Sequence, residues 1–115
     1  MYNEPMLRDN ALKGQTIVVT GGGTGLGRAM STYFLKLGAN VVITSRKLEV
    51  LQKAAGEMQL ETGGKVLAVK CDVRNYDEVT SLLEDAVKTF GSVNGLLNIS
   101  DSFLLLLLLL LPRFH

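Results

Sequence analysis

The sequence has few of the residues that would mark a secreted, metal-binding or nucleic-acid-binding chain. Its 115 residues include one cysteine, Cys71, so a single chain holds neither a disulfide framework nor a cysteine-rich metal site. Twelve lysines and arginines stand against eleven aspartates and glutamates, a balance that excludes an evident nucleic-acid surface. Residues 1–14 are polar and contain no apolar signal core. We therefore expect a soluble, cytoplasmic protein with no metal site.

Apolar runs and helical periods alternate along residues 14–99. Short runs rich in β-branched or aliphatic residues at 15–20, 39–45, 65–73 and 95–99 predict buried strands, and the segments between them have helical spacing. Strand–helix alternation of this kind predicts an α/β fold with a doubly wound parallel sheet of about four strands and helices on both faces.

Three helices are expected between these strands. The second segment, 48–64, has an apolar stripe of helical period and ends at paired glycines. Ahead of the third, Asn75 followed by Glu78 resembles a capping box, and Gly91 closes the helix. The stripe predicted to face the core in the first helix comprises Leu26, Ala29, Met30, Tyr33, Phe34 and Leu37.

Eight consecutive leucines, 104–111, break this organisation and are followed by Pro112. The run has neither helical nor strand period, and it is shorter than the roughly 20 apolar residues that a membrane-spanning helix needs. We interpret residues 100–115 as an aberrant leucine-rich tail that arises from a shifted reading frame or a mis-joined segment. A buried strand or an interfacial anchor is the alternative.

Five glycines lie in the stretch TGGGTGLG, between the first predicted strand and the first predicted helix. Glycine there permits a sharp turn and lets a pyrophosphate approach the backbone N–H groups at the start of the helix. A glycine-rich turn without a ligand is the alternative. A P-loop is excluded because Gly27 is followed by Arg28 and Ala29 rather than Lys and Ser or Thr. The residues assigned to this phosphate site are Gly21, Gly22, Gly23, Thr24, Gly25, Leu26 and Gly27.

The second predicted strand ends without an acidic residue. Ser45, Arg46 and Lys47 stand there, and the first carboxylate is Glu49. An acid at this place holds the ribose 2′-hydroxyl of NAD, whereas an arginine accommodates the 2′-phosphate of NADP through charge-assisted hydrogen bonds. The sequence therefore predicts NADP, with an ordinary solvated basic pair as the alternative.

The third predicted strand ends in the sequence CDVR. Asp72 beside the apolar Val73 fits an adenine pocket, because a carboxylate can accept a hydrogen bond from an exocyclic amine. Taken alone, Asp72 is better explained as the cap of a turn.

Together, Thr20–Gly27, Ser45–Lys47, Cys71–Val73 and the sequence GLLN resemble the short-chain dehydrogenase/reductase family over about residues 12–99. The details are most similar to the 2,4-dienoyl-CoA reductase branch, with a 3-oxoacyl-[acyl-carrier-protein] reductase as the second candidate. The resemblance implies a Rossmann-type sheet in the order 3-2-1-4 with strand 95–99 at its open edge. It also implies an extension at 1–13, a dinucleotide-binding half-domain at 14–99, and NADPH as reductant of an acyl-CoA.

The resemblance also extends to Asn98, and it indicates which of the family's catalytic residues have no counterpart here. Asn98 matches the first asparagine of the family's Asn-Asn-Ala-Gly, but Ile99 and Asp101 depart from that pattern. The family's general-acid Tyr has a Lys four residues later, and no tyrosine here does. We therefore assign no catalytic residue and expect this chain alone to be an inactive, unstable truncation, with a non-catalytic nucleotide-binding module as the alternative. The family's oligomerisation helices are also without counterparts, and no nucleic-acid partner or membrane span is expected.

Overall fold

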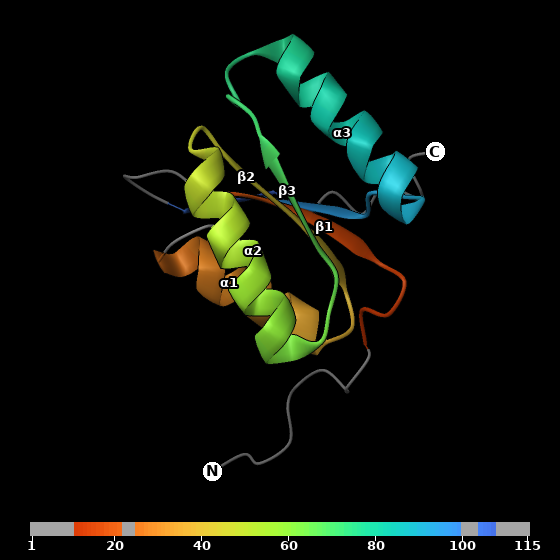
Figure 1. Ribbon diagram of the computed structural model, residues 1–115. Helices are drawn as coiled ribbons and strands as arrows, with labels where there is room; N and C mark the ends of the chain where they lie inside the picture. The colour runs from red at the N-terminus through yellow and green to blue at the C-terminus, as the bar shows by residue number, and fades with distance from the viewer. Residues whose placement is uncertain (1–10, 22–24, 100–103, 108–115) are drawn as a thin grey trace.

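The structure is a computed structural model that describes residues 11–21, 25–99 and 104–107. Within these residues, strands and helices alternate as far as the fourth strand, and a fifth strand follows it directly (Figure 1). The elements are β1 (Thr16–Thr20), α1 (Gly25–Lys36), β2 (Asn40–Ser45), α2 (Leu48–Thr62), β3 (Val66–Lys70), α3 (Tyr76–Phe90), β4 (Gly95–Ile99) and β5 (Leu104–Leu107).

The first four strands form a parallel sheet in the order β3-β2-β1-β4, which confirms the predicted fold class and strand order. Thr20, the last residue of β1, lies between Thr44 of β2 and Asn98 of β4. The chain moves outward from β1 to β2 and β3, and then returns to the other side of β1 through α3. The carboxyl end of β1 is therefore the point at which the strand order reverses, where such sheets bind ligands.

Strand β5 adds a fifth, antiparallel member to the sheet. It pairs with β4 in the register Leu96↔Leu107 and Asn98↔Leu105. The expectation that β4 forms the open edge is therefore wrong, and the strand interpretation of the leucine run applies to residues 104–107. The rest of the run and Pro112 lie outside the described residues.

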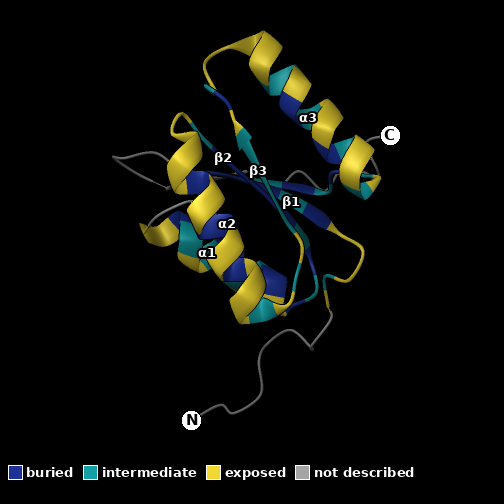
Figure 2. Cartoon of the chain, in the orientation of Figure 1, coloured by how far each residue is buried: buried dark blue, intermediate teal, exposed yellow. Residues whose placement is uncertain are grey.

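The sheet separates two apolar layers (Figure 1). Helices α1 and α2 cover one face, where Val41 and Ile43 of β2 join Leu51 and Met58 of α2 in one core cluster. Helix α3 covers the other face, where Val42 packs with the third helix. Buried residues line the sheet and the inner faces of the helices, while exposed residues cover the outer faces (Figure 2). Residues of alternating direction on β2 therefore serve both layers.

The predicted apolar stripe of helix α1 is confirmed only in part: Met30 and Phe34 are partly buried against the core, and Leu37 is buried just after the helix. Gly27, Ser31 and Leu35 are its buried residues, whereas Leu26 is 50% exposed and Tyr33 is 44% exposed. The small residues bring the helix close to the sheet, and the Ser31 hydroxyl donates to the Gly27 carbonyl at 2.8 Å, so its burial leaves no unpaired polar group. The prediction that Tyr33 belongs to the core is wrong.

The ends of the other elements follow local chemistry. Helix α2 ends at Gly63, whose φ of 73° is left-handed, as the paired glycines predicted. Strand β3 ends at Lys70, three residues earlier than predicted, so that Cys71 and the two following residues form a loop. Helix α3 begins after Asn75, whose side chain accepts hydrogen bonds from the N–H groups of Asp77 and Glu78. That is half of the predicted capping box; Glu78 instead accepts from the N–H of Asp72.

Replacement of Asn75 by alanine is expected to lower the free energy of unfolding by about 1 kcal/mol, because two N–H groups of α3 lose their acceptor. Urea denaturation of the full chain measures this change. Asn75→Asp, which keeps an acceptor, should be near wild type, and Gln52→Ala on the exposed face of α2 serves as the matched control. An equal effect of the Asn75 and Gln52 alanine variants would contradict the assigned cap.

Candidate nucleotide-binding site

A hollow of about 400 Å³ lies at the carboxyl edge of the parallel strands. The ends of β1 and β2, the loop after β3, and β4 all contribute to it, so residues far apart in sequence meet there. The hollow brings together Gly21, Ser45, Arg46, Asp72, Val73 and Asn98 from the predicted site, and it adds Thr20, Thr44, Cys71 and Arg74.

The glycine turn begins at Gly21, which has a φ of 71°. This left-handed conformation is costly for other residues, and it turns the chain sharply away from β1. The Gly21 N–H donates to the Thr44 carbonyl at 2.7 Å, so it extends the β1–β2 ladder and is not available to a phosphate. Gly22, Gly23 and Thr24, predicted as phosphate contacts, lie outside the described residues.

Helix α1 begins at Gly25, which also has a positive φ, of 57°. The first N–H groups of a helix have no intrahelical partner and carry partial positive charge, and α1 has no acidic residue in its first turn. This end of α1 therefore fits a pyrophosphate. Leu26 is half-exposed and Gly27 is buried, and neither lines the hollow.

The basic segment after β2 borders two hollows. Arg46 lines the hollow described above and also a second one, of about 390 Å³, to which Lys47 belongs. The Ser45 hydroxyl accepts a hydrogen bond from the Lys47 N–H at 3.1 Å, which fixes the turn between β2 and α2. We define the second space as the basic hollow; its lining residues are Arg46, Lys47, Leu48, Glu49, Val50 and Lys70.

Asp72 is held by Arg74, a contact that the sequence prediction missed. The Arg74 guanidinium donates to both carboxylate oxygens at 3.2 Å, and the Arg74 N–H donates to Oδ1 at 3.0 Å. These bonds, chiefly those from the guanidinium, lower the pKa of Asp72, so the carboxylate is ionised at neutral pH. The turn-capping interpretation of Asp72 therefore describes its contacts in this structure. An Arg two residues after an Asp was the available signal.

Two polar residues close the hollow on the side of β4. The Thr20 hydroxyl donates to Asn98 Oδ1 at 2.6 Å, across the paired ends of β1 and β4. Cys71 lies at the opposite side, 1% exposed, and burial raises the pKa of its thiol. The thiol is thus protonated at neutral pH and unsuited to act as a nucleophile. The sequence showed no sign of the hydrogen bond between Thr20 and Asn98, because the two residues are 78 positions apart.

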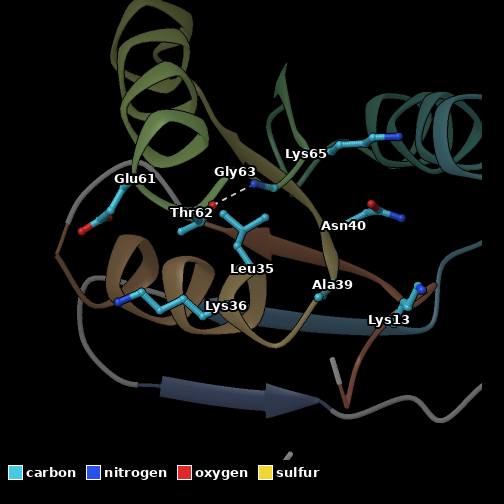
Figure 3. Close-up of a pocket in the computed structure, with 11 residues that line it drawn as sticks. Lys13, Leu35, Lys36, Ala39, Asn40, Glu61, Thr62, Gly63 and Lys65 are labelled. Carbon is cyan, nitrogen blue, oxygen red and sulfur yellow. Dashed lines mark hydrogen bonds between the residues drawn. The ribbon is translucent and has the colours of Figure 1, made fainter. Parts of the chain in front are cut away.

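A third hollow, of about 510 Å³, lies at the opposite, amino end of β2 (Figure 3). Lys13, Lys36 and Lys65 border it, and the side chain of Lys36 is directed to one side while that of Lys65 is directed to the other. A hydrogen bond from the Gly64 N–H to the Thr62 hydroxyl, at 3.1 Å, is the interaction drawn there. The charged groups do not converge on one point, so this hollow has no arrangement that would bind a small anion.

No helix within the described ranges is both long and apolar enough to cross a bilayer. In the same part of the chain, no three side chains of His, Cys, Asp or Glu gather as a metal site would require.

Comparisons with known proteins agree with this geometry. The family model for short chain dehydrogenases matches residues 15–100. Among curated relatives, "Probable 2,4-dienoyl-CoA reductase 3" of Caenorhabditis elegans is 38% identical over 98% of this chain and 37% of its own length. The peroxisomal 2,4-dienoyl-CoA reductase of Danio rerio is 34% identical over 85% of this chain and 31% of its own.

Solved structures of similar fold include a citronellol catabolism dehydrogenase of Pseudomonas aeruginosa PAO1. It has a TM-score of 0.73 at 40% identity, over 83% of this chain and 39% of that one. L-Sorbose reductase of Gluconobacter frateurii, solved with NADPH and L-sorbose, has a TM-score of 0.74 at 31% identity, over 79% and 35%. This chain thus spans about a third of the length of the curated relatives it matches. With most of its residues matched by the family model, the chain belongs to the short chain dehydrogenase family.

Proposed function

We propose that this chain is the NADP-binding part of a short-chain oxidoreductase. The observation that carries the proposal is the position of Arg46, which borders the hollow at the carboxyl edge together with Asp72. Residues 45–48 contain no carboxylate that would hold a ribose 2′-hydroxyl and repel a 2′-phosphate. The NADPH in the structure of L-sorbose reductase supports a nicotinamide cofactor for this fold.

Two walls of the hollow, and the start of α1 outside it, are each suited to one part of the cofactor. Asp72 and Val73 would border the adenine, Arg46 the 2′-phosphate, and the start of α1 the pyrophosphate. Arg74 donates to both oxygens of Asp72, and the remaining lone pairs of the carboxylate could accept from the adenine amine. When bound, NADPH supplies a hydride; the residues described above bind and orient it.

For the enzyme to which this chain is related, we propose reduction of a 2,4-dienoyl-CoA. The two relatives named for that activity, at 38% and 34% identity, support the assignment. The 115-residue chain by itself would bind cofactor without turning it over. Tyr33 and Tyr76 lie exposed on helices, neither lines the hollow, and neither has a lysine four residues later. A proton donor with its supporting cation is therefore lacking among the described residues.

Calorimetric titration of the full chain with NADPH and with NADH tests the proposal. We expect NADPH to bind at least about tenfold more tightly, because one charge-assisted contact to a phosphate is worth about 1.4 kcal/mol or more. Binding of neither cofactor, or equal binding of both, would overturn the assignment.

The absence of turnover is a separate expectation. Incubation of the full chain with NADPH and a 2,4-dienoyl-CoA should leave the absorbance of NADPH decaying at the rate of a protein-free control. Oxidation above that rate would show that this chain holds a proton donor we have not assigned.

A further inference from the structure

The basic hollow holds three cations and one carboxylate. Arg46, Lys47 and Lys70 line it with Glu49. Among the described residues, no ion pair involves any of these four side chains; the pairs present are Arg28 with Glu57 and Arg74 with Asp72. Three like charges around one space repel each other, and an anion placed there would relieve that repulsion.

Lys70 reaches this hollow because of the strand register. It is the last residue of β3 and pairs with Ser45, the last residue of β2. Val69, its neighbour, packs with the core cluster beneath α3, so Lys70 projects to the opposite face, on the side of α2. The side chain therefore meets the segment that carries Arg46, although the two residues are 24 positions apart.

The basic hollow adjoins the hollow at the carboxyl edge of the parallel strands, because Arg46 lines both. Arg46 also lies close enough for its charge to contribute to the lowered pKa of Asp72, after the larger effect of Arg74. A nucleotide with its adenosine beside Asp72 would thus have the basic hollow next to its ribose.

We propose that Lys70 is a second determinant of NADP selectivity, with its ammonium facing the 2′-phosphate from β3 while Arg46 contacts it from the end of β2. This inference rests on the proposed function and adds a specific residue to it. Arginine suits bidentate contact with phosphate oxygens, and lysine acts as a compact point charge on the same group. The other explanation is that Lys70 only protects β3, an edge strand, from pairing with other chains.

Calorimetry at low ionic strength separates these explanations, because it measures how tightly the full chain binds NADPH and NADH. Lys70→Gln should weaken the binding of NADPH by about 3- to 10-fold, because one charge-assisted contact near the surface is lost. The affinity for NADH should stay within about twofold of wild type. Lys70→Arg keeps the charge and should stay within about twofold of wild type for both cofactors. Lys65→Gln is the matched control, since Lys65 is also exposed but lies at the opposite end of β3, beside the hollow of Figure 3.

The outcomes distinguish the role of Lys70 from the proposed function on which that role rests. A preference for NADPH that is as large in Lys70→Gln as in wild type overturns the role of Lys70 and leaves the proposed function standing. A wild-type chain without any preference overturns both. Equal loss of NADPH and NADH in Lys70→Gln assigns the residue to general stability instead, and circular dichroism of the variant would show the same loss.

Discussion

Replacement of Ile43 by alanine is expected to lower the free energy of unfolding by about 2–5 kcal/mol, the range for removing a large buried aliphatic side chain. Ile43 is fully buried in β2, which lies between β1 and β3. Its side chain belongs to the cluster that joins the sheet to α1 and α2. Small domains have unfolding free energies of about 5–15 kcal/mol, so this variant would lose a large fraction of the total. Urea denaturation of the full chain, followed by circular dichroism, measures the change.

Two further variants make the expectation sharper. Ile43→Val removes one methylene and should cost about 0.5–1.5 kcal/mol, so the effects should be graded by the volume removed. Val50→Ala alters a residue of α2 that is 39% exposed, and it should change stability by less than about 1 kcal/mol. If Ile43→Ala cost no more than Val50→Ala, the assignment of Ile43 to the centre of the core would be wrong.

The strands were predictable because their chemistry is local. Runs such as 16–20 and 40–45 consist largely of β-branched residues, and a parallel strand covered on both faces needs apolar residues in every direction. The end of β3 was harder, because Cys71 and Val73 extend the apolar pattern into a loop that is fixed by contacts of Asp72 and Arg74. The run at 104–107 has no period at all, so only its pairing with β4 identifies it as a strand.

Helix α1 shows why a helix can be predicted while part of its buried face is not. Counting apolar residues favours the side of Leu26 and Tyr33, which the structure leaves exposed. The side that packs on the sheet carries Gly27 and Ser31, because close approach of helix to sheet requires small residues there. A hydropathy pattern registers the apolar character of a residue and not its size, so it identified Met30 and Phe34 but not Gly27 and Ser31.

The residues of the candidate site also divide into those that the sequence predicted and those that it did not. Arg46 and Asp72 were identified because the end of each parallel strand in a doubly wound sheet reaches one edge, whatever the loop lengths. Thr44 and Thr20 were missed because a threonine at a strand end carries no signal until its neighbours across the sheet are known. The same is true of Lys70, which reaches the basic hollow only through its register with Ser45.

Arg46→Gln is expected to weaken NADPH binding by about 10- to 100-fold, because hydrogen bonds to charged groups contribute about 1.5–3 kcal/mol each. Glutamine keeps a polar side chain of similar reach and removes the charge. Arg46 has no ion-pair partner among the described residues, so its loss leaves no carboxylate unpaired in the free chain. The change should therefore act on binding and leave the free energy of unfolding within about 0.5 kcal/mol of wild type.

The ratio of the two cofactor affinities carries this prediction. NADH lacks the 2′-phosphate, so its affinity should change by no more than about twofold in Arg46→Gln. Both affinities are compared at one ionic strength, because salt screens interactions between charges. Arg28→Gln provides the matched control: Arg28 is also a partly exposed arginine, but it pairs with Glu57 at 2.8 Å between α1 and α2 and lines neither hollow. Removing it should alter neither affinity. A parallel loss of NADPH and NADH in Arg46→Gln would mean that Arg46 holds a part common to both cofactors, and the choice of NADP would then need another cause.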